Sequence, residues 1–211
     1  MLAGRKKWDV VLQQMDDRDV HLVGMQEVRE SAARISVKGS FITCTAAAVR
    51  GAAGCAIVLN TRSPWAWRLG RPCKIAKRDV SILLSEPRML IVSVKASGVD
   101  LVAVSVYGPL VDNAECTVEE FWEHVRGSIS TLARQRSVIL LVDANATTAT
   151  GIDGCVGDIV SGKPSLNSAA LGHFLTDAAL WIPATYAHFG DTVLGTSFSK
   201  DGQSMSRVDY V

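Results

Sequence analysis

Three apolar stretches of the chain each lead to a polar residue that could bind a metal ion or accept a proton. They are HLVGMQEV, which contains Glu27, VAVSVYGP, which contains Tyr107, and VILLVDANA, which contains Asp143 and Asn145. An apolar run that stops abruptly is typical of a buried strand. Because strand ends lie at the rim of a sheet, where loops form ligand pockets, these residues are candidates for functional sites.

Asp143 and Asn145 are the pair whose spacing most directly suggests chemistry. On an extended chain, side chains two positions apart face the same side. The carboxylate could then accept a proton from water while the amide donates to an oxygen of a phosphate. The same residue types are also common where a strand ends in a turn, because their side chains bond to nearby backbone groups. The pair alone leaves both interpretations open.

Glu27, Tyr107 and Asp209 are each open to two interpretations. A single carboxylate such as Glu27 is what Mg²⁺ typically takes from a protein, and Glu27 could also simply begin a solvated loop. Tyr107 precedes Gly-Pro, which ends its strand, and its phenol could bond a phosphate oxygen or cap the core with its hydroxyl in water. Asp209 lies in the strand-like SRVDYV and could be a site residue or a surface acid.

The elements that must position these residues follow from the hydrophobic periodicity. Helices are predicted at the start of the chain, where Trp8, Val11, Leu12 and Met15 share one face, and over 118–134 and 167–179. Strands are predicted over 20–25, 54–60, 80–84, 89–95, 100–107, 137–145, 195–199 and 206–211. Residues 146–165 form a loop, and Gly98 is the expected site of positive φ in a hairpin. Many strands with few helices favour one α/β domain with packed mixed sheets and helices outside.

The composition is that of an ordinary globular protein. With 211 residues, of which 48% are hydrophobic and 20% charged, the chain can fill one domain. A formal net charge of +1 gives no global basic field, although a local basic groove remains possible. Five cysteines scattered singly, without a signal peptide or a membrane-spanning run, predict reduced thiols in a nuclear or cytoplasmic protein.

Taken in chain order, six segments resemble the endonuclease/exonuclease/phosphatase superfamily, which includes DNase-I-like enzymes. They are MQEVRE, RGAAGCAIVLN, VAVSVYGPL, ILLVDANAT, SLNSAALGHFLTDAALWIPATY and GTSFSKDGQSMSRVDYV. They look most like the branch found in non-LTR (LINE-type) retrotransposons. The resemblance runs from about Leu22 to Val211. It implies a four-layer α/β sandwich, in which two mixed β-sheets pack face to face with helices outside, formed as a single domain over residues 1–211.

The resemblance also implies a reaction, the nicking of DNA by Mg²⁺-dependent hydrolysis of a phosphodiester, with Mn²⁺ as a possible substitute. By match to the family, Glu27 would bind the metal, which would act as a Lewis acid. Asp143 would orient or deprotonate the attacking water. Asn145 and Tyr107 would hold phosphate oxygens where charge grows in the transition state. Asp209 would orient a histidine that acts on the same phosphate.

The sequence departs from the family pattern at both ends. The family normally has an Asn-bearing strand before the first helix and a Ser-Asp-His strand shortly after the counterpart of SRVDYV, and neither is present in this sequence. None of the four histidines, at 21, 124, 173 and 188, lies in that motif, and all four are interpreted as structural. The expectation is a domain without its first and last strands, whose activity is impaired because groups that act together are missing.

Two other functions are consistent with the same residues. One is hydrolysis of an inositol phosphate or a nucleotide, because a fold does not settle its substrate. The other is non-catalytic binding of nucleic acid, in which a set of basic residues would contact phosphates, although they could also be ordinary surface charges. That set is Arg29, Arg34, Lys38, Arg50 and Arg62.

Overall fold

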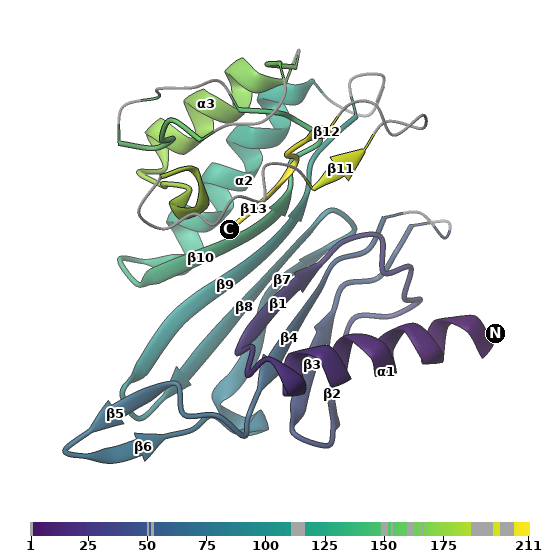
Figure 1. The fold of residues 1–211 in the computed structure, drawn as a ribbon, viewed down its shortest axis with the longest axis vertical. Coiled ribbons are helices and arrows are strands. Elements are labelled where there is room, and N and C mark those ends of the chain that lie inside the picture. Colours follow the sequence, from purple (N-terminus) through teal and green to yellow (C-terminus); the bar gives the residue numbers. More distant parts are fainter. Residues whose placement is uncertain are drawn as a thin grey trace. The chain divides into compact units, whose positions relative to one another are not determined.

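A computed structural model describes residues 2–49, 51, 53–110, 117–148, 152, 154–159, 163–165, 167–186, 196–198 and 205–211 (Figure 1). The chain divides into two compact units. The first comprises Met1–Ser105 and Arg136–Val138, and the second comprises Val106–Gln135 and Ile139–Val211. Two strands, β9 (Val99–Tyr107) and β10 (Ser137–Asp143), contribute residues to both units.

The first unit begins with helix α1 and an antiparallel sheet. The elements are α1 (Leu2–Asp17), β1 (Leu22–Met25), β2 (Arg34–Lys38), β3 (Phe41–Thr45) and β4 (Ala56–Asn60). The strand order is β1-β4-β3-β2, with Gly24 opposite Ile57 and Ile57 opposite Cys44. All residues of β3 and β4 are buried, whereas β2 is mostly exposed. The hydrophobic run of β4 was therefore visible in the sequence, and the β2–β3 hairpin was not.

The first unit also holds the strands β7 (Val80–Glu86), β8 (Met89–Ala96) and most of β9, which are neighbours in that order. The pairing of β7 with β8 is antiparallel and shifts register between Ile82 and Leu84. Gly98 has a φ of 75° in the turn between β8 and β9, as predicted. A separate hairpin of β5 (Ala66–Arg68) and β6 (Arg71–Cys73), followed by the short helix η1 (Lys77–Asp79), lies between β4 and β7 in the chain.

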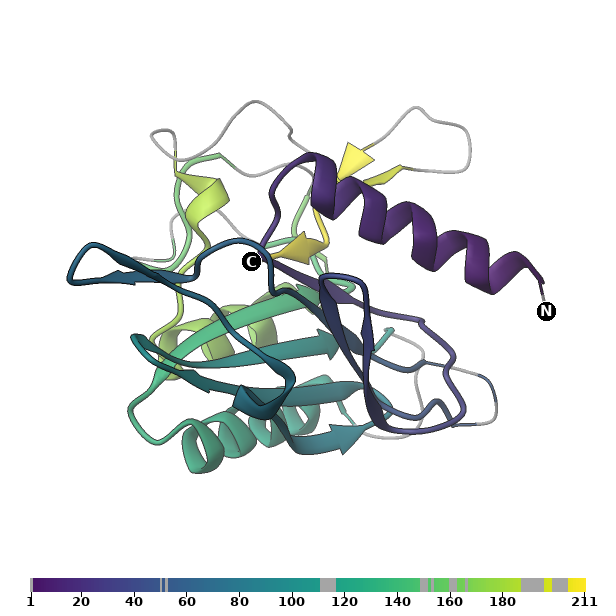
Figure 2. The same ribbon diagram turned by 90° about the horizontal axis from the view of Figure 1, so that it is seen from below.

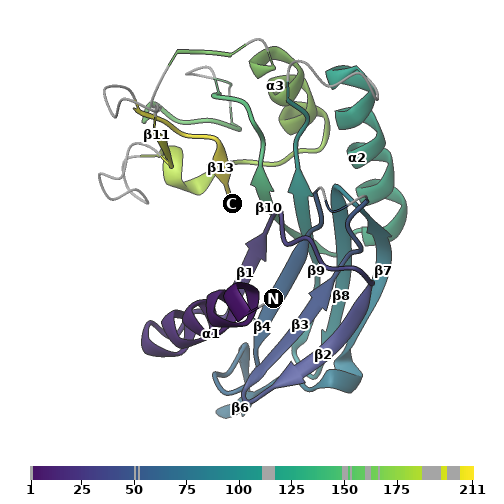
Figure 3. The same ribbon diagram turned by 90° about the vertical axis from the view of Figure 1, so that its right-hand side faces the viewer.

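The hydrophobic effect explains how these elements pack. Leu12 and Met15 of α1 form a buried cluster with Phe41 and Val58, so the predicted apolar face of α1 covers this sheet (Figure 3). On β8, the residues from Met89 to Val94 are all buried, and β8 contacts β4. Strands buried on both faces read as continuous apolar runs, which is why their positions could be predicted.

The second unit contains α2 (Val118–Ala133), α3 (Ser168–Asp177), η2 (Pro183–Thr185), β11 (Ser197–Phe198), β12 (Met205–Ser206) and β13 (Asp209–Tyr210). Within it, β13 lies beside β10, and β10 lies beside the end of β9. Helix α2 begins at a capping box in which the Thr117 side chain accepts from Glu120 N at 3.2 Å and Thr117 N donates to the Glu120 carboxylate at 2.9 Å. The rings of Trp122 and Phe174, 4.9 Å apart, join α2 to α3.

The single strand predicted over SRVDYV is two short strands that pair with different partners, β12 with β11 and β13 with β10. Arg207, between them, is buried and donates to the carbonyl of Ala184 at 3.0 Å. Among the described residues, no helix has the length and apolar character needed to span a bilayer.

Arg136 ties the strands of the second sheet together within the first unit. Its side chain is only 20% exposed. The guanidinium forms an ion pair with Asp100 and donates to Ser93 Oγ at 3.0 Å and to Leu101 O at 2.8 Å.

Substitution of Arg136 tests this role. Arg136→Lys keeps the charge but loses the several N–H donors of the guanidinium, so we expect the free energy of unfolding, measured in urea, to fall by about 2 kcal/mol. Arg134→Lys, at an exposed site, is the matched control and should change stability little. Equal effects of the two substitutions would contradict the role assigned to Arg136.

Candidate active site

Asp143 and Asn145 form a hydrogen-bonded turn at the end of β10. The half-buried Asp143 is the last residue of the strand, and its Oδ1 accepts from Asn145 N at 3.1 Å. Asn145 has a φ of 46°, a left-handed conformation that Asn tolerates. The alternation of an extended strand therefore stops before Asn145. The Asp143 side chain instead accepts from the backbone of Asn145 in a side-chain turn, which is the geometry of the alternative interpretation.

The turn after β10 is joined to the end of β9 at Gly108. Gly108 N donates to Asp143 O at 2.7 Å, and Asn145 Nδ2 donates to Gly108 O at 2.9 Å. A Cβ on Gly108 would lie 2.4 Å from Ala144 O, so only glycine permits this approach of the two backbones. Tyr107, the preceding residue, is 8% exposed. The structure therefore places Tyr107, Asp143 and Asn145 at the same end of neighbouring strands.

Asp209 lies directly opposite Asp143 in the antiparallel pair of β13 and β10. Paired residues project to the same face of a sheet, where two like charges repel. Such an arrangement favours a cation or a positively charged group beside the two carboxylates. The backbone of this segment is well held: Ala144 N donates to Val208 O at 2.7 Å, and Asp209 N donates to Thr196 Oγ1 at 3.1 Å.

Several residues that sequence reasoning missed hold the segment after β10 in place. The Tyr210 hydroxyl is buried, accepts from Thr148 N at 3.1 Å, and lies 2.6 Å from Arg207 O. Burial raises the pKa of the Tyr210 phenol, so it stays protonated as a structural group. Asn167, 2% exposed, donates to Pro109 O at 3.1 Å. In the sequence, Asn167 lies just before an apolar helix and within one of the segments that carry the family resemblance.

Glu27 lies in the first unit, at the end of β1. It is exposed and has a φ of 55°, which is uncommon for a residue with a Cβ. The conformation is held by its neighbours, because Val28 N donates to Gly54 O at 3.1 Å and Arg29 N donates to Ala53 O at 3.2 Å. The Glu27 carboxylate lies 3.7 Å from the Arg29 guanidinium. Glu27 is thus an exposed carboxylate on a fixed backbone.

The candidate phosphate-binding cations are all paired, as far as the described residues show. Arg29 pairs with Glu27, Arg34 with Glu30, Lys38 with Asp9 and Arg62 with Asp16, while Arg50 lies outside the described residues. These pairs are solvent-exposed, and exposed ion pairs contribute little to stability.

Three of the four histidines lie in the part of the chain that the structure describes. His21 lies 3.1 Å from both Asp19 O and Pro64 O and packs its ring against Trp65, which is a structural role. His124 lies on α2, His173 lies on α3, and His188 falls outside the described residues.

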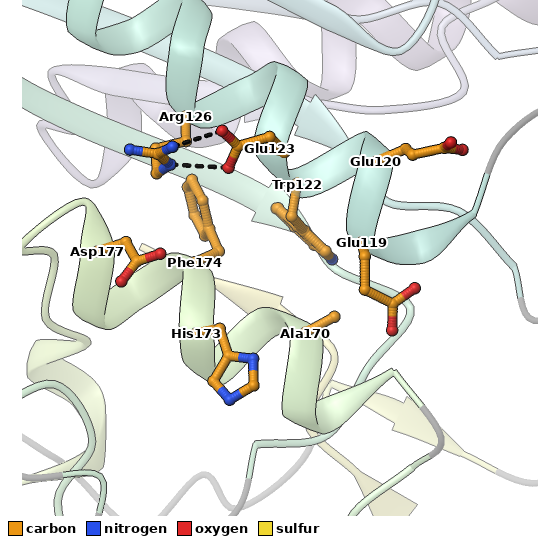
Figure 4. A pocket seen from close by; sticks show the side chains of 9 residues that line it. All are labelled: Glu119, Glu120, Trp122, Glu123, Arg126, Ala170, His173, Phe174 and Asp177. Atoms are coloured by element: carbon orange, nitrogen blue, oxygen red, sulfur yellow. Dashed lines mark hydrogen bonds and ion pairs between the residues drawn. The ribbon is translucent and has the colours of Figure 1, made fainter.

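A pocket of about 350 Å³ lies between α2 and α3, with His173 at its edge (Figure 4). Trp122 and Phe174 form its floor, while Glu119 and Asp177 are among the carboxylates at its rim. None of the predicted site residues lines this pocket. Trp122 Nε1 is buried there without a hydrogen-bond partner among the described residues. At the rim, the Arg126 side chain lowers the pKa of Glu123, chiefly through a hydrogen bond.

Solved structures show what the chain is similar to. The endonuclease domain of TRAS1, a telomere-specific non-LTR retrotransposon, superposes with a TM-score of 0.57 at 15% identity, over 94% of this chain and 75% of that one. The AP endonuclease LMAP from Leishmania major superposes with a TM-score of 0.63 at 10% identity, over 98% of this chain and 73% of that one. No protein-family model matches the sequence, and no curated protein matches it either. These likenesses confirm the predicted fold, the DNase-I-like α/β sandwich.

The close approach at Gly108 can be tested directly. Gly108→Ala places a methyl group against the carbonyl of Ala144 and forces the ends of β9 and β10 apart. We expect a loss of about 3 kcal/mol in the free energy of unfolding, measured by chemical denaturation. Gly127→Ala is the matched control, because a Cβ there meets nothing within 4 Å and α2 should gain up to about 1 kcal/mol. A Gly108→Ala protein as stable as the wild type would refute the constraint.

Proposed function

We propose that this chain hydrolyses phosphodiester bonds in DNA with the aid of a divalent metal ion, Mg²⁺ or Mn²⁺. The observation that carries the proposal is the set of polar residues at the ends of β9, β10 and β13. Asp143 is paired with Asp209 on the neighbouring strand, and Asn145 is hydrogen-bonded to Asp143 at the end of β10 and to Gly108 after β9. The fold that surrounds them is the one found in two solved endonucleases.

In this proposal Asp143 orients or deprotonates the attacking water. Its half-buried position, with one carboxylate oxygen held by Asn145 N, fixes the direction of the other oxygen. Asn145 uses one of its two amide donors on Gly108 O, which leaves the second for a phosphate oxygen. Tyr107 is the second phosphate-binding group, and Asp209 holds a positively charged group against the phosphate. Positioning of this kind needs no covalent intermediate.

Glu27 is the proposed metal ligand. Its exposed carboxylate suits Mg²⁺, which keeps several waters and usually takes only one or two carboxylates from the protein. The described residues contain no group of three or more acidic, histidine or cysteine side chains able to hold a metal, so Glu27 is proposed as a single protein ligand. When bound, the ion would polarise the phosphate and stabilise the leaving oxygen.

Substitution of Asp143 tests the assignment. Asp143→Asn keeps the shape and the acceptor of the turn but removes the basic carboxylate. The rate at which supercoiled DNA becomes open-circular in Mg²⁺ should fall by about 10²- to 10⁴-fold, while the melting temperature changes little. Asp177→Asn, an exposed acid on α3, is the control and should nick at the wild-type rate. Equal rates for the two variants would remove Asp143 from the mechanism.

A second candidate function is non-catalytic binding of nucleic acid. The observation in its favour is that basic side chains of the first unit are exposed, namely those of Arg29, Arg34, Lys38 and Arg62. Exposed basic side chains of this kind neutralise backbone phosphates in complexes with nucleic acid. Salt-dependent binding of DNA by the purified chain, without nicking in Mg²⁺ or Mn²⁺, would select this function.

A further inference from the structure

The hairpin of β5 and β6 extends away from the sheets of the first unit (Figures 1 and 2). Arg68 pairs with Arg71, so the two residues between them, Leu69 and Gly70, make the whole turn. Both have positive φ values, 50° and 72°. This is the pattern of a type I′ turn, whose twist matches that of the strands. The hairpin is therefore a tight and regular ribbon.

The base of the hairpin is firmly attached. Trp65 N donates to Cys73 O at 2.8 Å, and Trp65 Nε1 donates to Asn60 O at 2.6 Å. The turn at Gly98 packs against the base so closely that a Cβ there would lie 3.4 Å from Cys73 Sγ. Cys73 is correspondingly 9% exposed. A ribbon fixed at its base presents its tip in one orientation, and such preorganisation lowers the entropic cost of binding.

The tip carries two large apolar side chains in water. Leu69 is 95% exposed and Trp67 is 68% exposed. A leucine in the left-handed region costs about 1 kcal/mol or more relative to glycine, and Asn or Gly is the usual residue at this position. Neither burial nor turn formation explains why a leucine stands at position 69. Strain and exposure at one residue are features that structures retain where a partner is contacted.

Exposed cations lie on the hairpin and just after it in the chain. Arg68, Arg71, Lys74 and Lys77 are all exposed, and none forms an ion pair with a described carboxylate. Four other cations of the first unit, Arg29, Arg34, Lys38 and Arg62, each have such a partner. The hairpin and the segment just after it are thus a local basic surface in a chain of formal net charge +1. A basic surface with exposed apolar groups matches a polyanion that also offers flat apolar faces.

We propose that the tip of the β5–β6 hairpin contacts duplex DNA. Arg68 and Arg71 would neutralise backbone phosphates, while Leu69 and Trp67 would pack against sugars or base edges in a groove. A two-stranded ribbon fits a groove of DNA, and apolar wedges flanked by arginines are a known means of binding there. The choice of DNA over other polyanions rests on the proposed function.

Binding measured without metal separates this inference from catalysis. A fluorescent duplex of 20 base pairs is titrated with the full chain in EDTA at several salt concentrations. The double variant Arg68→Gln/Arg71→Gln should bind about tenfold more weakly at 0.1 M salt, and the slope of log K against log salt should become shallower by about 2. The control Arg18→Gln/Arg134→Gln removes the same charge from exposed sites outside the hairpin and should change the slope by less than half as much.

Leu69→Asn provides a test that no purely structural role can imitate. Asparagine suits the left-handed turn, so the variant should be more stable than the wild type and yet bind DNA several-fold more weakly. If it binds as tightly as the wild type, or if the arginine variant keeps the wild-type slope, the proposal is overturned. Variants that lose binding to phosphatidylserine vesicles while keeping DNA binding would also overturn it, in favour of a membrane surface.

The binding titrations and the nicking assay together distinguish the hairpin contact from the proposed hydrolysis. A wild-type chain that never nicks DNA in Mg²⁺ but binds it through the hairpin would support this inference and refute the proposed hydrolysis. A chain that nicks DNA at rates indifferent to the hairpin variants, with unchanged binding, would support the hydrolysis and refute the hairpin contact.

Discussion

The arrangement of the candidate active site depends on one backbone contact, the approach of Gly108 to Ala144 at the ends of β9 and β10. Buried amide and carbonyl groups need partners, and strand ends are where the ladder no longer supplies them. Here the strand ends satisfy each other, through Gly108 N and Asp143 O on one side and Ala144 N and Val208 O on the other. Three strand ends are thus fixed together, and the side chains of Asp143, Asn145 and Asp209 follow from their positions.

Buried hydrogen bonds of two side chains stabilise this arrangement. The Tyr210 hydroxyl accepts from the backbone N of Thr148, and the Asn167 amide donates to the backbone O of Pro109. These bonds fix the segments that follow β10 and β9. Groups that act on a phosphate must be held close to their working geometry before substrate arrives, because reorganisation would consume binding energy. The elements that carry the proposed chemistry are strand ends, while the supporting residues come from α3 and β13.

Helices and strands with many buried apolar residues could be predicted from the sequence, and exposed ones could not. Helices α1 and α2 and strands β4, β8, β9 and β10 were predicted because their apolar residues recur with a clear period or run continuously. The hairpins β2–β3 and β5–β6 were not, since β2 and β5 are largely exposed and the buried β3 has Thr43 and Thr45 in place of a continuous apolar run. The cysteines at all four described positions are buried, and burial raises the pKa of the Cys44 thiol to about 12. For Asp143 and Asn145 the sequence left both an extended strand and a side-chain turn open, and the structure has the turn, with a left-handed backbone at Asn145.

The central claim is that this fold, with these polar strand ends, hydrolyses DNA. The most direct test is to incubate the purified, folded chain with covalently closed supercoiled DNA in Mg²⁺, in Mn²⁺ and in excess chelator, and to follow the appearance of open circles. The account predicts open circles that form with either metal, increase with protein concentration and stop when the chelator is added. Supercoiled DNA that stays intact over all metal concentrations, or nicking that continues in the chelator, would contradict it.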